Sequence, residues 1–423
     1  MAKGLRVAVI GGGGREHALV WKLAQSPLVG QILAVPGNPG MAGEPKTVCL
    51  VVGPDNGNIV QAAKERSVDF VVIGPEAHIA AGLADAFDKA GILVLGPRKS
   101  GAILEASKIF AKDLMVRNGI PTAPYQWFDL YAAASRYILG HPLPVVVKAD
   151  GLASGKGTTV ARTKAEALAA ARKWLAKGRI VVEEFLDGEE ASFICLVSGT
   201  RFTLWPTSQD HKRLLDGDQG PMTGGMGAYS PAPVMDESTV GRTIAEIVVP
   251  LLRALDIEMI PYTGPLYIGL MITADGPKVL EFNCRLGDPE AQVLLMRLQS
   301  DLFLILSGAA RGEFHEPSLW DSRPAVCVVL AAHGYPENPR TRDEISGLDA
   351  ADAIEEVKVF HAGTEYRDKK LVTAGGRILG VTAMGDTIQE AKDRAYQAVE
   401  KIHFAGMHYR GDIGWRALER DRH

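Results

Sequence analysis

The sequence predicts a multidomain protein with an α/β domain first, an α+β part in the middle and a mixed α/β segment last. Three observations lead to this prediction. The chain has 423 residues, which at roughly 150 residues per domain suggests two to four domains. Apolar runs alternate with amphipathic runs over residues 5–100, whereas short β-rich segments dominate farther along the chain.

Composition excludes several classes of protein. The chain carries 46 Lys and Arg against 50 Asp and Glu, a net charge of −4, and binders of nucleic acid or membrane surfaces need a concentrated positive field. No stretch reaches the ~18 apolar residues of a membrane helix. The four cysteines lack pairing or metal-ligand spacing, which indicates a reducing, cytoplasmic compartment; they are Cys49, Cys195, Cys284 and Cys327.

Strands alternate with helices in the first predicted domain. Amphipathic runs predict helices at 17–26, 58–67 and 80–91, and continuous apolar runs predict strands at 5–10, 31–37, 69–75 and 92–97. This alternation predicts a parallel sheet covered on both faces. Open sheets of this kind bind ligands beyond the carboxyl ends of their strands, which here end at Gly11, Gly37, Gly74 and Gly96.

The next elements are β-rich. A predicted helix at 102–118 leads through two prolines to a small α+β subdomain, with a helix at 164–178 and β segments at 144–150, 158–163, 179–185 and 191–199. A helix near 240–255 and a hairpin over 266–283 follow. From about residue 325, a mixed α/β cap is predicted from strands at 325–332 and 377–384 and a helix at 387–402.

Four glycines, Gly11 to Gly14, follow the first strand and precede Arg15, Glu16 and His17. Backbone N–H groups at such a strand-to-helix turn can hold an anion. A nicotinamide site is excluded because the last glycine of G-x-G-x-x-G is missing and no ribose-binding acid follows the second strand. A phosphate on a smaller ligand remains, with a tight turn that binds nothing as the alternative.

A second glycine-rich segment runs from Lys148 to Gly157. It differs from the phosphate loop G-x-x-x-x-G-K-[ST], because only three residues separate Gly151 from Gly155 and Gly157 replaces the hydroxyl residue. We interpret it as a hairpin that closes over phosphates, with charge from Lys148 and Lys156. A mobile hairpin without a ligand is the alternative.

Carboxylates form two further candidate groups. Glu183, Glu184 and Glu190 lie near the end of an apolar strand, where simple surface exposure is the favoured interpretation. Glu281 and Asn283 are separated by one residue, so they face one side of a strand while Phe282 faces the core. Paired oxygen ligands of this kind suit Mg²⁺; an edge strand with a polar face is the alternative.

The sequence Arg285-Leu286-Gly287-Asp288-Pro289-Glu290 follows directly. Arg285 would place a guanidinium beside the proposed metal. The second interpretation is a salt-bridged turn in which Asp288 caps a helix, and the two can hold together. The segments 208–213 and 223–229 are typical of substrate loops. The lone His211 is interpreted as a hydrogen-bonded structural residue.

Several segments together resemble the glycinamide ribonucleotide synthetase family (phosphoribosylamine–glycine ligases) of the ATP-grasp superfamily, in order and along the whole chain. They are GGREHAL (13–19), GPEA (74–77), KADGLASGKG (148–157), EEFLDGEEASF (183–193), TSQDHKR (207–213), GPMTGGMGAYSPAP (220–233), EFNCRLGDPE (281–290), FHAGT (360–364) and DIGWRA (412–417).

The resemblance implies three domains and one reaction. It implies a Rossmann-like substrate-binding domain at 1–101, an ATP-grasp domain at 102–324 with a lid at about 122–190, and a C-terminal domain at 325–423. The implied reaction joins glycine to 5-phosphoribosylamine through glycyl phosphate, with ATP as co-substrate and Mg²⁺ or Mn²⁺ as cofactor. No nucleic acid or membrane partner is implied, and the chain is expected to be a monomer or weak homodimer.

The resemblance also implies roles for individual residues. Lys108 and Lys148 would bind the ATP phosphates, Glu190 the ribose, and Glu281 with Asn283 the metal, while Lys148 and Arg285 would be catalytic. The phosphate cover would comprise Asp150, Gly151, Ser154, Gly155, Lys156 and Gly157, and the adenine hinge Glu183, Glu184, Phe185 and Leu186. The acceptor pocket would comprise Gly13, Gly14, Arg15, Glu16, Asn38, Pro39, Gly40 and Glu76, with Asp210, Gly225, Gly227 and Asp288 also near substrate.

Two alternatives remain open at this stage. One is a different ATP-grasp carboxylate–amine ligase, and the other is a non-catalytic nucleotide-binding regulator. The sequence departs from the family at Gly12, where relatives often carry Asn. The presence of Lys148, Glu281 and Asn283 favours an enzyme.

Overall fold

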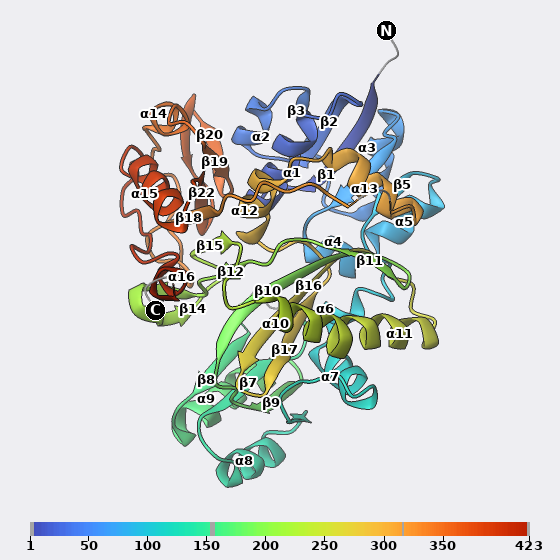
Figure 1. The fold of residues 1–423 in the computed structure, drawn as a ribbon, viewed down its shortest axis with the longest axis vertical. Coiled ribbons are helices and arrows are strands. Elements are labelled where there is room, and N and C mark those ends of the chain that lie inside the picture. Colours follow the sequence, from blue (N-terminus) through green and yellow to red (C-terminus); the bar gives the residue numbers. More distant parts are fainter. Residues whose placement is uncertain (1–3, 153–156, 315–316, 421–423) are drawn as a thin grey trace.

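The computed structural model describes residues 4–152, 157–314 and 317–420. Figure 1 shows the N-terminal and C-terminal parts side by side at the top, the central antiparallel sheet below them and a small lobe at the bottom. The predicted class, a multidomain α/β and α+β protein with a parallel N-terminal sheet, is confirmed.

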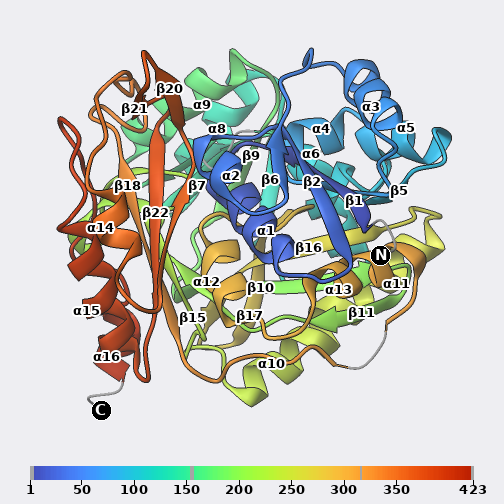
Figure 2. The same cartoon turned by 90° about the horizontal axis from the view of Figure 1, so that it is seen from above.

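The N-terminal part is a five-stranded parallel sheet of order β3-β2-β1-β4-β5. Alternate residues of β1 enter two cores: Val9 packs with Leu19 of α1, whereas Ile10 packs with Phe87 of α5. Helices therefore cover both faces, as predicted (Figure 2). The strands are β1 Leu5–Gly11, β2 Val29–Pro36, β3 Thr47–Cys49, β4 Phe70–Ile73 and β5 Leu93–Leu95; the helices are α1 Gly14–Ala24, α2 Pro39–Gly43, α3 Asn56–Glu65, α4 Glu76–Ala80 and α5 Leu83–Lys89.

The single helix predicted at 102–118 is wrong, because Ser107 divides it. Ser107 has extended backbone (φ −138°, ψ 110°), and its hydroxyl accepts a hydrogen bond from Phe110 N at 3.2 Å. Its side chain therefore caps a new helix instead of continuing the old one. The two helices are α6 Ile103–Ala106 and α7 Lys108–Arg117.

The lower lobe is an antiparallel sheet of order β6-β9-β7-β8. Its core packs Val145 and Ile180 against Ala134 of α8 and Ala171 of α9. The segment 191–199 was expected in this subdomain but belongs to the central sheet, where it pairs with β16 along its whole length. The elements are β6 Tyr125–Phe128, α8 Tyr131–Gly140, β7 Val145–Ala149, β8 Thr158–Ala161, α9 Lys164–Leu175 and β9 Ile180–Glu184.

The central sheet is antiparallel, in the order β11-β10-β16-β17. The predicted hairpin is confirmed as β16 and β17, and the helix expected near 240–255 is a continuous run that includes one π-helical turn over Ile244–Val248. The elements are β10 Glu189–Ser198, β11 Arg201–Leu204, α10 Glu237–Thr243, α11 Val249–Ile257, β16 Thr263–Thr273, β17 Gly276–Asn283, α12 Glu290–Arg297 and α13 Leu302–Arg311.

The C-terminal sheet has the order β12-β15-β18-β22-β19, so two strands from residues 209–230 join it. The predicted strands at 325–332 and 377–384 are antiparallel neighbours, and α15 packs on them. The elements are β12 Gln209–Asp210, β13 Arg213–Leu215, β14 Gln219–Met222, β15 Gly227–Ser230, β18 Ala325–Ala331, α14 Leu348–Asp352, β19 Val357–His361, β20 Thr364–Arg367, β21 Lys370–Thr373, β22 Arg377–Met384, α15 Ile388–Val399 and α16 Trp415–Arg420.

Two sequence expectations concern cysteines and membranes. All four cysteines are unpaired, and three of them are buried. Within residues 4–152, 157–314 and 317–420, no helix has the length and apolar character needed to cross a membrane.

Candidate active site

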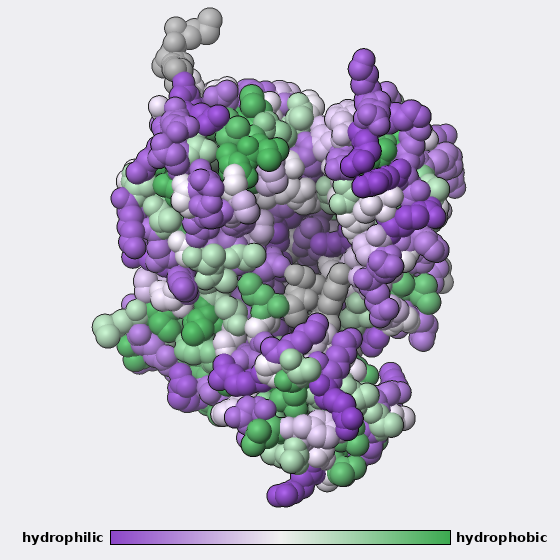
Figure 3. Space-filling view, turned by 180° about the vertical axis from the view of Figure 1, so that it is seen from behind, coloured by the Kyte–Doolittle hydropathy of each residue, from purple (hydrophilic) through white to green (hydrophobic). Residues whose placement is uncertain are grey.

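One large cavity, of about 720 Å³, is lined by residues from every part of the fold. Gly12 and Glu76 come from the N-terminal part, Lys148 from the lower lobe, Glu281 from the central sheet and Arg377 from the C-terminal sheet. Viewed from behind, the surface is hollowed between the lobes and hydrophilic side chains gather in the hollow (Figure 3). Residues from several of the sequence motifs therefore line one cavity.

A buried ion cluster forms the lower wall of the cavity. Glu183 is 2% exposed, and its Oε2 lies 2.9 Å from Nζ of Lys148 and 3.1 Å from Nζ of Lys112. Burial opposes ionisation of Glu183, but the charges of Lys148 and Lys112 hold its pKa below the usual value. The expectation of a surface carboxylate is wrong for Glu183, because two lysines compensate its charge.

Lys112 is a site residue that the sequence analysis missed. Burial lowers its pKa to about 8, although Glu183 opposes this change. Its Nζ also donates to the Thr122 hydroxyl at 2.8 Å. The available signal was its spacing, since Lys108 and Lys112 are four residues apart and so lie on one face of α7.

The predicted phosphate cover is only partly described. Lys108 Nζ donates to the Gly151 carbonyl at 3.0 Å, and Gly151 and Gly157 line the cavity. Asp150 does not line it: its Oδ1 accepts from Ser107 Oγ at 3.1 Å and its Oδ2 pairs with Arg179 at 2.9 Å. Asp150 thus joins the loop to the start of α7. Ser154, Gly155 and Lys156 lie outside the described residues, and their roles stay predictions.

The hinge residues lie where β9 leaves the lower lobe. Glu183, Glu184, Phe185 and Leu186 all line the cavity, as does Glu190 at the start of β10. Burial raises the pKa of Glu190, and Asp210 adds to this effect while Lys212 opposes it. Asp210 and Lys212 form an ion pair at 2.9 Å on the same wall.

Glu281 and Asn283 lie at the end of β17 and both line the cavity. Phe282 also borders the cavity, but it is 2% exposed and packs in the hydrophobic core. The predicted alternation of faces is therefore present. Burial opposes ionisation of Glu281, but Lys212, Lys108 and Lys148 hold its pKa below the usual value. The site thus presents an ionised carboxylate and an amide oxygen, the donors that Mg²⁺ prefers.

The metal would need further ligands from its substrate. In the described ranges, no group of three or more His, Cys, Asp or Glu side chains is placed to hold a metal ion. Mg²⁺ commonly takes one or two protein oxygens and completes its shell with phosphates and water. The donor pair on β17 fits that pattern.

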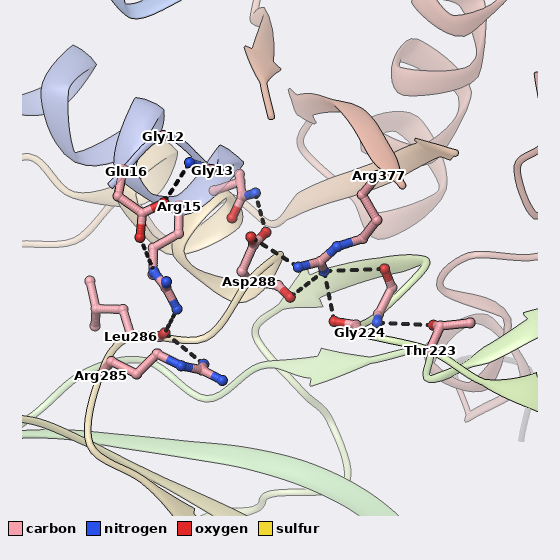
Figure 4. Close-up of polar contacts among 12 residues, drawn as sticks. Gly12, Gly13, Arg15, Glu16, Thr223, Gly224, Arg285, Leu286, Asp288 and Arg377 are labelled. Carbon is pink, nitrogen blue, oxygen red and sulfur yellow. Dashed lines mark hydrogen bonds and ion pairs between the residues drawn. The ribbon is translucent and has the colours of Figure 1, made fainter. Parts of the chain in front are cut away.

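The four-glycine loop folds around the carboxylate of Glu16. Gly13 N donates to Glu16 Oε2 at 2.7 Å, and Arg15 Nε donates to Glu16 Oε1 at 2.6 Å (Figure 4). A Cβ on Gly74 would lie 2.0 Å from Glu16 Oε1. Glu16 is only 2% exposed, so the glycines in part accommodate this side chain. Gly12, Gly13, Arg15 and Glu16 line the cavity.

Residues 38–40 lie behind the loop and not on the cavity wall. Asn38 Nδ2 donates to the carbonyls of Gly12 at 3.0 Å and His361 at 2.9 Å, and its Oδ1 caps α2 by accepting from Met41 N. Pro39 and Gly40 begin α2. The geometry shows Asn38 linking the glycine loop to β19.

Arg285 lies between two acidic side chains. Its Nε donates to Glu76 Oε2 at 3.1 Å, and its Nη2 lies 3.5 Å from Glu105 Oε1 and from Asn283 Oδ1. Burial opposes the charge of Arg285, but Glu105 and Glu76 outweigh it and raise the pKa. A fixed positive charge therefore lies beside the proposed metal ligands, as expected.

Asp288 pairs with an arginine and does not cap a helix. Pro289 holds the cap position of α12 without a side-chain hydrogen bond, whereas Asp288 Oδ2 lies 3.0 Å from Nη2 of Arg377. Burial opposes ionisation of Asp288, yet Arg377 and Arg15 hold its pKa below the usual value. The helix-cap alternative is wrong because β22 supplies a guanidinium to this carboxylate.

The glycine-rich segment at 223–228 approaches the cavity at Thr223 and Gly224. Gly225 and Gly227 lie behind that wall; Gly225 has φ +111°, and a Cβ there would lie 2.7 Å from Pro289 Cδ. His211 is fully buried and its Nε2 accepts from Gly414 N at 3.0 Å. The structural interpretation of His211 agrees with this contact.

The fold and this cavity define an ATP-grasp protein. Residues 106–291 match the family model described as phosphoribosylglycinamide synthetase, ATP-grasp (A) domain, residues 5–105 match its N domain, and residues 325–416 match its C domain. The chain belongs to the phosphoribosylglycinamide synthetase family.

Full-length relatives agree with this membership. A protein of Agrobacterium fabrum named phosphoribosylamine–glycine ligase is 49% identical over 425 residues, covering 99% of this chain and 100% of the relative. Its counterpart in Brucella melitensis biotype 1 is 48% identical and covers 99% of both chains. A crystal structure of the ligase from Thermotoga maritima superposes with a TM-score of 0.83 at 35% identity, covering 96% of this chain and 100% of that one.

Proposed function

We propose that this chain joins glycine to 5-phosphoribosylamine at the expense of ATP, giving glycinamide ribonucleotide, ADP and phosphate in purine biosynthesis. The observation that carries the proposal is the convergence of the Lys108–Lys148 pair, the Glu281–Asn283 pair and the Gly12–Gly13 loop on one cavity. The three sets bring cations, metal ligands and an anion-binding loop together, as a ligase for a phosphorylated amine requires.

Within this proposal the lower wall receives the nucleotide. Lys108 and Lys148 hold the phosphates, residues 183–186 hold the base and Glu190 holds the ribose. The Glu183 carboxylate lies 2.9 Å from Lys148 Nζ, which fixes that ammonium in the cavity. Phosphoryl transfer depends chiefly on positioning and charge neutralisation, and Lys148 and Arg285 supply both.

Glu281 and Asn283 would hold Mg²⁺, and the same oxygen donors also suit Mn²⁺. When bound, the metal supplies charge neutralisation on the phosphates. The chain's own groups keep Glu281 ready for it, because the three nearby lysines stabilise its ionised form.

The upper wall receives the acceptor. Gly13 and Arg15, with Glu76 across the cavity, are proposed to line the phosphoribosylamine site, and Asp210 and Asp288 to lie near glycine. Glycyl phosphate is labile in water, so closure of the lower lobe at about 122–190 would serve to exclude solvent. The domain limits at 101 and 324, a cytoplasmic location and a monomeric or weakly dimeric state belong to the same proposal.

Oxygen transfer tests the reaction directly. Glycine labelled with ¹⁸O in its carboxylate is incubated with the chain, ATP, Mg²⁺ and phosphoribosylamine, and the released phosphate is analysed by mass spectrometry. One labelled oxygen per phosphate is expected, because a carboxylate oxygen reaches phosphate only if the carboxylate was phosphorylated. Unlabelled phosphate during full turnover would exclude glycyl phosphate. Phosphate release stimulated by another amino acid in place of glycine would favour a different ATP-grasp ligase.

A further inference from the structure

Arg377 extends from the C-terminal sheet and lines the cavity beside Asp288. It is the first residue of β22 and lies outside the sequence motifs of the family. Its side chain is 21% exposed and lines the cavity. Figure 4 shows the guanidinium pointing away from its own sheet toward Asp288 and Gly224.

The guanidinium of Arg377 holds two separate segments. Its Nη1 donates to the Gly224 carbonyl at 2.7 Å and to the Asp288 carbonyl at 2.6 Å, and its Nη2 donates to Asp288 Oδ2 at 3.0 Å. Gly224 N in turn donates to the Tyr335 hydroxyl at 3.0 Å. One side chain thus fixes the glycine-rich segment and the Asp288 turn relative to each other.

Asp288 continues this network to the four-glycine loop. A Cβ built on Gly13 would lie 3.7 Å from Asp288 Oδ2, and one built on Gly14 would lie 3.6 Å from Asp288 Oδ1. Gln292 Nε2 donates to Asp288 Oδ1 at 2.8 Å. The carboxylate therefore packs against the loop that is proposed to hold the sugar phosphate.

A carboxylate at this place would repel a phosphate unless its charge were compensated. Asp288 is held in its ionised form despite burial, first by the charge of Arg377, then by Arg15 and the Gln292 hydrogen bond, with a smaller contribution from Arg285. Arg15 also has the neighbouring Glu16 as a partner, at 2.6 Å. Arg377 forms a direct ion pair with Asp288, with Nη2 3.0 Å from Oδ2.

We propose that Arg377 is a positioning residue for the phosphorylated acceptor: it neutralises Asp288 and holds the Asp288 turn and Gly224 against the Gly13–Gly14 loop. This inference rests on the proposed function. It assigns to the C-terminal domain a role on the acceptor side of the cavity, whereas the nucleotide side is built from the lower lobe and central sheet.

Binding measurements on the full chain test the inference. Ribose 5-phosphate and Mg·ADP are each titrated calorimetrically into the wild type, R377Q, R377K and R367Q. The Arg367→Gln variant is the matched control, because Arg367 lies in the same domain, is 49% exposed and pairs with Glu365 at 3.6 Å. We expect R377Q to weaken ribose 5-phosphate binding at least tenfold and R377K to weaken it less, since lysine keeps the charge but not the fork of hydrogen bonds. Affinity for Mg·ADP should stay within twofold in every variant.

Steady-state kinetics provides the second readout. R377Q should raise the KM for phosphoribosylamine while the KM for ATP stays within twofold, a split that a general loss of folding would not produce. Equal ribose 5-phosphate affinity in the wild type and R377Q would overturn the inference. So would a parallel loss of Mg·ADP affinity and thermal stability in R377Q and R377K.

The two proposals fail in different ways. A wild-type chain that binds ribose 5-phosphate but forms no product from glycine would refute the proposed function. The inference about Arg377 would still be tested by comparing the ribose 5-phosphate affinities of the wild type and R377Q. A wild-type chain that does not bind ribose 5-phosphate would overturn the inference about Arg377.

Discussion

Replacing Glu183 with Gln should destabilise the chain strongly, because one buried carboxylate compensates two lysines. Glu183 is 2% exposed and lies 2.9 Å from Lys148 Nζ and 3.1 Å from Lys112 Nζ. Removing one partner of a buried ion pair costs about 3–5 kcal/mol. Lys112, whose pKa is already about 8, loses its proton more readily when residue 183 is neutral. The loss of its buried charge limits the decrease in the free energy of unfolding. We therefore expect a loss of about 3 kcal/mol at pH 7, roughly a 100-fold change in the unfolding equilibrium.

The loss should shrink as the pH rises. Without Glu183 the pKa of folded Lys112 falls further below 8, while that of unfolded Lys112 stays at its usual 10.5. Above the folded pKa of Lys112 the unfolded chain binds more protons than the folded one, so stability increases with pH. This gain starts near pH 8 in the wild type and at a lower pH in the variant, so the variant gains more stability between pH 7 and pH 9. At pH 9 the difference between E183Q and the wild type should therefore be smaller than at pH 7.

Urea unfolding followed by circular dichroism at pH 7 and pH 9 measures both effects. Glu184→Gln is the matched control, because Glu184 is the next residue of β9 and its side chain is exposed; its free energy of unfolding should change by no more than about 0.5 kcal/mol. An E183Q midpoint equal to that of the wild type at pH 7 would refute the reasoning. A difference that widens at pH 9 would show that Lys112 is not the group that limits the cost.

Three further predictions concern the metal, the ligand class and the glycine loop. Glu281→Gln should abolish most Mg²⁺-dependent turnover, since glutamine removes the ionised oxygen ligand, while thermal stability should fall less than in E183Q because Glu281 is only half-buried; unchanged Mg²⁺ dependence would contradict the assignment. Calorimetry should detect binding of ribose 5-phosphate and none of NAD, and the reverse would restore the nicotinamide interpretation. Gly74→Ala should lower the melting temperature by several degrees and Gly43→Ala should not, because a Cβ on Gly74 would lie 2.0 Å from Glu16 Oε1 and one on Gly43 meets nothing within 4 Å; equal melting temperatures would contradict the packing argument.

Local patterns in the sequence predicted most elements of the fold. The alternation of apolar and amphipathic runs identified the parallel sheet, and the spacing of Glu281, Phe282 and Asn283 gave the correct faces of β17. The two errors have different causes. Ser107 fits the helical pattern but caps a new helix through a local hydrogen bond from Phe110 N to its hydroxyl, whereas residues 191–199 follow the lobe in sequence but their strand pairs with the distant β16.

The parts of the site that were not predicted share one physical feature: each is a charge whose partner is distant in sequence. Glu183 was interpreted as an exposed acid because glutamates are generally exposed, yet Lys112 and Lys148 compensate its charge after folding. Arg377 follows an ordinary glycine turn, and its partner Asp288 lies 89 residues earlier. A sequence motif identifies groups that could take part in chemistry. The ion pairs formed in the folded chain determine which of these charges can be buried together. Asp288 illustrates the consequence, since its sequence context suggested a helix cap while its charge is held by a guanidinium from another domain. The proposed acceptor side of this cavity therefore depends on contacts that no single segment specifies.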